Sequence, residues 1–196
     1  ETFAGTGVCS ELKRDVPVLL NVDVDSTSAT DGVIFIRWTR PLTTPGNFDT
    51  VAMSGPYMYR LLHRAPGGQA VSVYTTSAQH LGQLDTTFTH TGLNTVTGPH
   101  VYQVEFFAGE ALVGGSQKAN SIFLGLVPDD KRVYLEWETA TPWQNETYRI
   151  HRRDPGSSTF SVVAVTSEQT LADTFNIKNG FEYCYFIESE GAYSDP

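Results

Sequence analysis

The sequence predicts an all-β protein made of two tandem β-sandwiches, the second of which lacks its last strand. No segment keeps an apolar period of 3.6 residues over three helical turns, so helices are not expected to build the fold. Short runs rich in Val, Ile, Tyr, Phe and Thr alternate with clusters of Gly, Pro, Asn and Asp, as in sandwiches and barrels. Strand patterns of the first half also recur in the second half.

Each copy contains a strand that carries a tryptophan, followed by a strand that carries a tyrosine. The matched segments are "GVIFIRWTRP" (32–41) with "RVYLEWETATP" (132–142), and "YMYRLLHRAPG" (57–67) with "ETYRIHRRDPG" (146–156). In each segment the aromatic residue alternates in phase with other apolar residues, which places it on one face of a strand. We therefore expect these four aromatics to lie in the core: Trp38, Tyr59, Trp137 and Tyr148.

The repeat continues to the end of the chain. "GLNT" (92–95) aligns with "NIKN" (176–179), and "HVYQVEFF" (100–107) aligns with "FEYCYFIE" (181–188). This alignment matches Tyr102 with Tyr183. Length differences fall between the strands, and the largest extra piece is the Gly- and Pro-rich segment 42–56. Since a one-residue slip would move every side chain to the other face, the preserved alternation indicates two copies of one β-domain.

Charge and hydropathy exclude two classes of partner. The chain of 196 residues carries 13 Lys and Arg against 22 Asp and Glu, a formal net charge of −9, so nucleic-acid binding is not expected. No apolar run approaches the ~18 residues that a membrane span needs, so no membrane insertion is expected. The chain has no signal-peptide pattern and no initiating Met, as expected of a mature protein or an excised interior segment.

The spacing of the aromatic residues resembles the fibronectin type III domain, an immunoglobulin-like sandwich. That family carries a core Trp on strand B, a Tyr on strand C, a Leu before strand F and a Tyr on strand F. The corresponding residues are Trp38, Tyr59, Leu93 and Tyr102 in the first copy, and Trp137, Tyr148, Ile177 and Tyr183 in the second. The second copy departs from the pattern at Ile177, where Leu is usual, and this is a mild change for an apolar plug.

Longer phrases resemble a narrower group. "CSELKRDVPVL", "SIFLGLVPDD", "TPWQNETYRIHRR" and "YCYFIESEGAYSDP" are similar to the tandem fibronectin type III region of large Bacteroidota surface proteins. Those proteins end in a gliding-motility-associated C-terminal domain, the sorting signal of type IX secretion. The resemblance implies an extracellular, cell-surface location. It also implies O-glycan signals in which Asp precedes the acceptor, at Ser26, Thr50 and Thr86.

The resemblance divides the chain into three parts. Residues 1–15 look like the remnant of a preceding repeat, 16–124 form the first domain, and 125–196 form a second domain truncated after strand F. The short apolar linker "FLGLVPDD" predicts limited interdomain motion. Strand F is expected to end near Ser189, with "GAYSDP" as the turn to a missing strand G. Its open edge is expected to be covered by an N-terminal segment of another molecule or by residues beyond the chain.

The two cysteines are expected to have different partners. Alternation turns Cys184 away from the core, where it can bridge to a neighbouring strand. The resemblance implies that this partner lies on strand G, and that Cys9 is the strand G cysteine of a preceding repeat. We therefore predict no Cys9–Cys184 disulfide within one chain.

The sequence contains no motif that indicates catalysis, and we expect no enzyme activity, cofactor or metal. His63 and His151 are expected to face outward from strand C, with His80, His90 and His100 in loops or at strand ends. The acidic stretches "DVDSTSATD" (23–31) and "PDDK" (128–131) lack the ligand spacing of a calcium loop. We interpret the first as a polar turn and the second as the start of the second domain.

The leading functional hypothesis is a non-catalytic spacer or interaction module that contacts neighbouring domains of its parent protein. Trp143 follows Pro142 and fits no strand phase, so it either packs against the loop base or the other domain, or contacts a ligand. If it contacts a ligand, the protein is an adhesin or carbohydrate-binding module that binds a glycan with Trp143 and the 42–56 loop. A further alternative is an accessory region of a secreted hydrolase.

Overall fold

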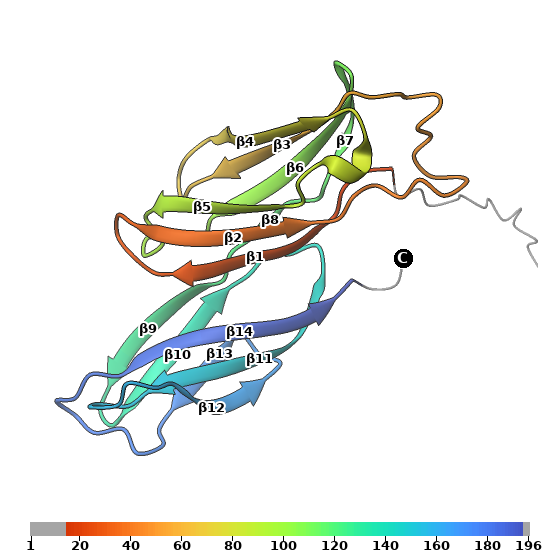
Figure 1. The fold of residues 1–196 in the computed structure, drawn as a ribbon. Helices are drawn as coiled ribbons and strands as arrows, with labels where there is room; N and C mark the ends of the chain where they lie inside the picture. The colour runs from red at the N-terminus through yellow and green to blue at the C-terminus, as the bar shows by residue number, and fades with distance from the viewer. Residues whose placement is uncertain (1–14, 194–196) are drawn as a thin grey trace, which may run out of the picture.

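The computed structural model describes residues 15–193, and these fold into two β-sandwiches placed one after the other (Figure 1). The prediction of an all-β fold is confirmed, since the helical structure of the described residues is a single 3-10 turn, Leu81–Gln83. None of the helical structure in residues 15–193 is long and apolar enough to cross a bilayer.

Two antiparallel sheets face one another in domain 1. One sheet has the order β1-β2-β5, and the other has the order β4-β3-β6-β7, with β8 also paired to β6. The strands are β1 (Leu19–Ser26), β2 (Gly32–Trp38), β3 (Tyr57–Arg64), β4 (Ala70–Ala78), β5 (Thr87–Leu93), β6 (Val101–Ala108), β7 (Ala111–Gly115) and β8 (Ala119–Asn120). This strand order is that of an immunoglobulin-like sandwich.

Domain 2 repeats the arrangement with fewer strands. One sheet has the order β13-β10-β9 and the other the order β12-β11-β14. The strands are β9 (Phe123–Asp129), β10 (Arg132–Glu138), β11 (Gln144–Arg153), β12 (Ser161–Thr166), β13 (Thr170–Asp173) and β14 (Cys184–Ala192). Within the described residues β14 pairs only with β11, so its other edge has no strand corresponding to β7 and β8 of domain 1.

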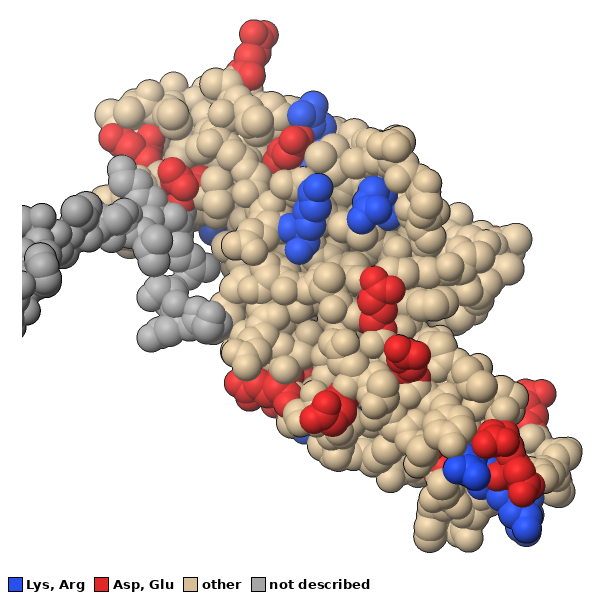
Figure 2. Space-filling view, turned by 180° about the vertical axis from the view of Figure 1, so that it is seen from behind, with Lys and Arg blue, Asp and Glu red and all other residues tan. Residues whose placement is uncertain are grey.

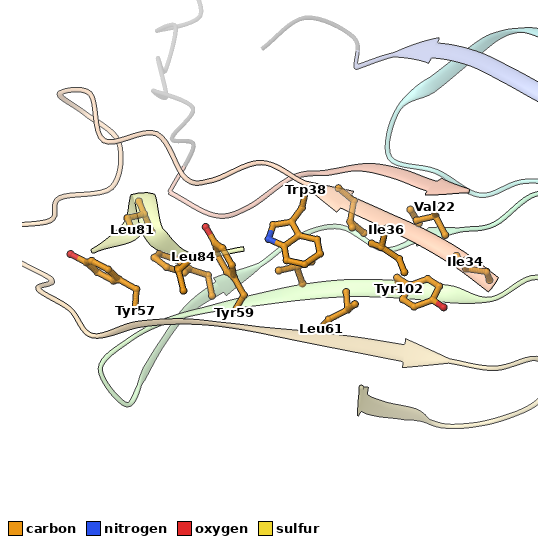
Figure 3. Close-up of a cluster of buried hydrophobic side chains, with 14 of the residues drawn as sticks. Val22, Ile34, Ile36, Trp38, Tyr57, Tyr59, Leu61, Leu81, Leu84 and Tyr102 are labelled. Atoms are coloured by element: carbon orange, nitrogen blue, oxygen red, sulfur yellow. The ribbon is translucent and has the colours of Figure 1, made fainter. Parts of the chain in front are cut away.

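The cores follow from the alternation of the strands. In domain 1, Trp38 and Tyr59 meet edge to face with ring centroids 6.0 Å apart, and both are buried (Figure 3). In domain 2, Trp137 and Tyr148 form the matching pair at 5.3 Å. The expectation that these four aromatics are core is confirmed. Burying such a ring contributes about 2–3 kcal/mol, so each pair is a main stabilising contact of its domain.

Three sequence-based expectations are corrected. "FLGLVPDD" is no linker: it forms β9, and "PDDK" forms the hairpin turn to β10, in which Lys131 adopts a φ of 52°. β9 begins at Phe123, slightly before the expected domain start, so only residues 121–122 separate it from β8. β14 extends past Ser189 to Ala192, because its last residues pair with the beginning of β11.

The strand F alignment is also wrong by two residues. His63 on β3 pairs with Tyr102 on β6, and the equivalent Arg152 on β11 pairs with Tyr185 on β14. Tyr102 therefore corresponds to Tyr185 rather than to Tyr183.

Candidate functional site

A groove of 1170 Å³ lies between the two domains. Its domain 1 wall is β1 together with residues 95–96, and its domain 2 wall includes β14 and the approach to β11. Figure 1 shows β1 on the side of domain 1 that faces domain 2. Residues of both domains line the groove.

Trp143 stands in this groove immediately before β11 and is half-buried. Its ring packs against the apolar core of domain 1, although the residue belongs to domain 2. Its indole Nε1 donates to Asn145 Oδ1 at 3.1 Å, and its ring lies 6.0 Å from that of Tyr193. Packing against the neighbouring domain was one of the two expected roles of Trp143. The other role, contact with a ligand, stays a prediction.

Hydrogen bonds tie the domains together around Trp143. The Asn120 backbone N–H donates to the Ala140 carbonyl at 2.9 Å, and the Ala140 N–H donates to the Asn120 side chain. The Tyr193 hydroxyl donates to the Leu19 carbonyl at the start of β1. These bonds join β8 to the residues after β10, and β1 to the residue after β14. They therefore restrict how far the two domains can separate at the groove.

The groove walls combine carboxylates with aromatic rings. Asp23 and Asp25 come from β1, and Glu188 and Glu190 come from β14. Arg149 pairs with Glu190 at 2.8 Å. The aromatic side chains that line the groove are Phe123, Trp143, Phe160 and Phe186. Acceptor oxygens beside ring faces suit recognition of a hydroxylated or cationic ligand.

The 42–56 loop does not contribute to this groove, since none of its residues lines it. The loop is held to domain 1 by Phe48, which is 3% exposed and packs against the rings of Tyr57 and Phe106. Val51 and Met53 are exposed on it. The structure therefore does not bring the loop and Trp143 to one surface, as a joint binding site would require.

The structure corrects the placement of two histidines. His63 is buried, with 6% exposed, because it alternates in phase with Tyr59 and Leu61 and so points inward. His90 lies within β5 rather than in a loop. The sequence already indicated the burial of His63, because Tyr59 and Leu61, which lie on the same face of the strand, are core residues. His151 does lie on the other face of its strand, where it stacks on Phe186.

Three histidines of domain 1 are brought together. The rings of His63 and His100 are hydrogen-bonded, Nε2 to Nδ1, at 2.8 Å, and the ring of His90 lies 4.7 Å from that of His63. His90 Nδ1 is 2.9 Å from the Tyr102 hydroxyl. Burial lowers the pKa of His63 to about 4, with repulsion from His90 and His100 adding to it, and burial also lowers the pKa of His90.

Within residues 15–193, no group of three or more His, Cys, Asp or Glu side chains is arranged to hold a metal ion. The acidic stretch 23–31 ends β1 and forms the turn to β2. In the "PDDK" turn, Asn179 donates to Asp130 at 2.7 Å and accepts from the Lys131 N–H. The acidic turns thus satisfy their polar groups within the protein.

Two modification expectations can be placed on the structure. Among the three O-glycan candidates, Ser26 and Thr50 are exposed, whereas Thr86 is half-buried. Cys184 has a free thiol beside the Arg153 guanidinium, with Arg153 Nη2 2.9 Å from Sγ. Cys9 lies outside the described residues, so the predicted absence of a Cys9–Cys184 disulfide stays a prediction.

Acidic residues are spread over both domains on the face that Figure 2 shows, and the basic residues of this face do not form a continuous patch among the described residues.

Comparison with known proteins adds little to these observations. No protein-family model and no curated protein matches the chain. Among solved structures, the chicken interferon gamma receptor alpha chain is similar over 88% of this chain and 89% of its own, with 12% sequence identity and a TM-score of 0.29. Tp47, the 47-kilodalton lipoprotein of Treponema pallidum, is similar over 95% of this chain and 51% of its own, with 13% identity and a TM-score of 0.28.

Proposed function

We propose that this chain is a non-catalytic spacer and interaction region of a secreted, surface-attached bacterial protein of the gliding-motility-associated, type IX secreted kind. The observation that carries the spacer role is the joint: residues 121–122 are the whole connection between β8 and β9, and hydrogen bonds span it. A short, hydrogen-bonded connection keeps two consecutive domains in a more constant relative position than a flexible linker does.

Small-angle X-ray scattering tests this role. A spacer requires a scattering profile, recorded at low protein concentration where the chain is monomeric, that fits one fixed two-domain arrangement. Asn120→Ala removes the side chain that accepts from Ala140 and should increase the maximum dimension and the radius of gyration. Gln69→Ala, at an exposed loop position between β3 and β4, is the control. A wild-type profile that requires freely moving domains would contradict the proposal.

The groove favours a second candidate function, that of an adhesin or carbohydrate-binding module. Trp143 and Phe186 present ring surface beside carboxylates in a groove of 1170 Å³, which matches the stacking and hydrogen-bonding needs of a glycan. A glycan array with the wild type and with Phe186→Ala distinguishes the two functions. Phe186 is the better test residue because its loss does not remove a contact with domain 1. If the wild type binds no glycan, the carbohydrate-binding function is rejected and the spacer role remains.

The open edge of β14 supports a further partner proposal, the addition of a strand from another chain. In domain 1, β7 and β8 cover the equivalent edge of β6. The unpaired backbone groups of β14 can accept a strand in the same way. We propose the N-terminal segment of another molecule as that strand. Sedimentation at several concentrations should show a dimer that deletion of residues 1–12 abolishes, and a monomer at all concentrations would contradict this.

A further inference from the structure

The histidine cluster occupies the same place in domain 1 as a buried ion pair in domain 2. Strand pairing gives the equivalence, because His90 lies opposite Ile34 and Asp173 lies opposite the matching Val133. The equivalent residues are His63 with Arg152, His90 with Asp173, and Tyr102 with Tyr185. Domain 1 therefore has imidazole rings where domain 2 has a buried Arg–Asp ion pair.

The two clusters make corresponding contacts. In domain 2, Arg152 Nη1 donates to Asp173 Oδ2 at 2.8 Å, and the Tyr185 hydroxyl donates to the same oxygen at 3.0 Å. In domain 1 the Tyr102 hydroxyl lies 2.9 Å from His90 Nδ1. A guanidinium stays protonated at any pH that a folded protein meets, whereas histidines titrate between about pH 5 and 8. Acidification therefore changes the charge of one cluster through a range in which the Arg152 guanidinium does not change.

Hydrogen bonding limits how many protons the domain 1 cluster accepts. His100 Nε2 lies 2.9 Å from the Asn94 carbonyl, which only accepts, so this nitrogen carries the hydrogen. Neutral His100 then has a bare Nδ1, which accepts from Nε2–H of His63. A proton added to His100 Nδ1 would point at that N–H and break the bond. Full protonation of the cluster is therefore incompatible with its present geometry.

Few other groups are able to compensate for added charge. The titratable groups that face His63 are His90 from β5, His100 from the loop just before β6, and Tyr102 from β6. Burial raises the pKa of Tyr102, so this hydroxyl stays neutral. Among the described residues no Asp, Glu, Lys or Arg side chain is hydrogen-bonded or ion-paired to the three rings.

The cluster is also connected to the joint between the domains. The His100 backbone N–H donates to Ser121 Oγ at 3.1 Å, and the Ser121 N–H donates to the His100 carbonyl at 2.9 Å. Ser121 is half of the two-residue connection, and its neighbour Asn120 holds Ala140 of domain 2. A displaced His100 would therefore move the connection itself.

We propose that His63, His90 and His100 form a proton-binding site that loosens the interdomain joint on acidification. The depressed pKa values of His63 and His90 agree with this. Because His63 and His90 bind protons less readily in the folded state than in the unfolded state, the stability of domain 1 is greatest above pH 6.5 and falls as the pH drops towards about 4. For each such histidine, lowering the pH by one unit in this window raises the unfolding equilibrium constant by up to about tenfold.

The test combines imidazole NMR with a distance measurement on the full chain. Fluorophores are attached through Val51→Cys and Ser158→Cys, both exposed positions, after Cys9→Ser and Cys184→Ser. Between pH 7.5 and 3 the distance distribution should broaden, and the midpoint of this change should coincide with the pH at which His63 titrates in the NMR spectrum. Domain 2 should remain folded throughout this pH range.

The decisive variant transfers the domain 2 pair into domain 1, as His63→Arg together with His90→Asp. It should abolish the pH-dependent broadening, whereas the control His80→Gln, outside the cluster, should retain it. The same broadening in the double variant, or histidine titration in the wild type with no change in distance, would overturn the proposal. If the double variant does not fold, titration of His63 and His90 near the ordinary pKa of 6.5 in the wild type would overturn it as well.

Discussion

Truncation of Trp137 tests how the small core of domain 2 holds that domain together. Trp137 is 2% exposed and meets Tyr148 edge to face, with the ring centroids 5.3 Å apart. Replacing a buried Trp with Ala costs about 3–5 kcal/mol, from lost apolar burial and the cavity left behind. Since small domains are stable by only about 5–15 kcal/mol, Trp137→Ala is expected to bring domain 2 close to unfolding while domain 1 stays folded.

A smaller substitution refines the magnitude. The Nε1–H of Trp137 is buried and has no hydrogen-bond partner within residues 15–193, and an unsatisfied buried donor costs about 1–3 kcal/mol. Trp137→Phe removes this donor together with part of the ring, so the two effects oppose one another. We expect Phe to cost well under half as much as Ala at this position.

Urea denaturation, followed by far-UV circular dichroism and by tryptophan fluorescence, measures both changes. The matched control is Trp143→Ala, since Trp143 is half-buried and its removal should cost about 1 kcal/mol. In Trp137→Ala the transition of domain 2 should move to much lower urea while that of domain 1 remains. If Trp143→Ala proved as destabilising as Trp137→Ala, the reading of strand phase behind both assignments would be wrong.

Three further predictions concern single contacts. Arg152→Met leaves the buried Asp173 without its cation and should destabilise domain 2 by about 3–5 kcal/mol in the same urea assay, whereas a near-neutral effect would show that the pair contributes little. Phe48→Ala removes the ring that anchors the 42–56 loop and should cost domain 1 about 3–5 kcal/mol; unchanged stability would mean that the loop is held elsewhere. Peptide mass mapping without reducing agent should find no Cys9–Cys184 crosslink within one chain, and finding one would refute the assignment of Cys184 to a neighbouring strand.

The sequence was sufficient for the fold because strand faces are encoded locally. Trp38, Tyr59 and Tyr148 each alternate in phase with apolar neighbours, so their burial follows from a few consecutive residues. The histidine cluster was not predictable in this way. His63 lies on β3, His90 lies on β5 and His100 lies just before β6, so their contact depends on how the two sheets of domain 1 face each other.

The interdomain groove could not be predicted for a related reason. Its walls come from β1 and β14, which lie at opposite ends of the described chain, and their separation is set by docking of the two domains. Trp143 was recognised because it broke the strand phase, but only the docked arrangement shows that its ring reaches the core of the other domain.

The misalignment of strand F shows which errors alternation is unable to detect. A slip of one residue reverses every side chain, whereas a slip of two residues leaves each side chain on its original face. Matching Tyr102 with Tyr183 therefore preserved the alternation of buried and exposed residues. It concealed that the histidine cluster of domain 1 and the Arg152–Asp173 pair of domain 2 occupy equivalent positions. The contacts decide the register, since Tyr102 reaches His90 with its hydroxyl as Tyr185 reaches Asp173. The corrected register places His100 opposite Tyr183 in the alignment, and both residues then hold the loop that precedes strand F, through Asn94 in one domain and Lys178 in the other.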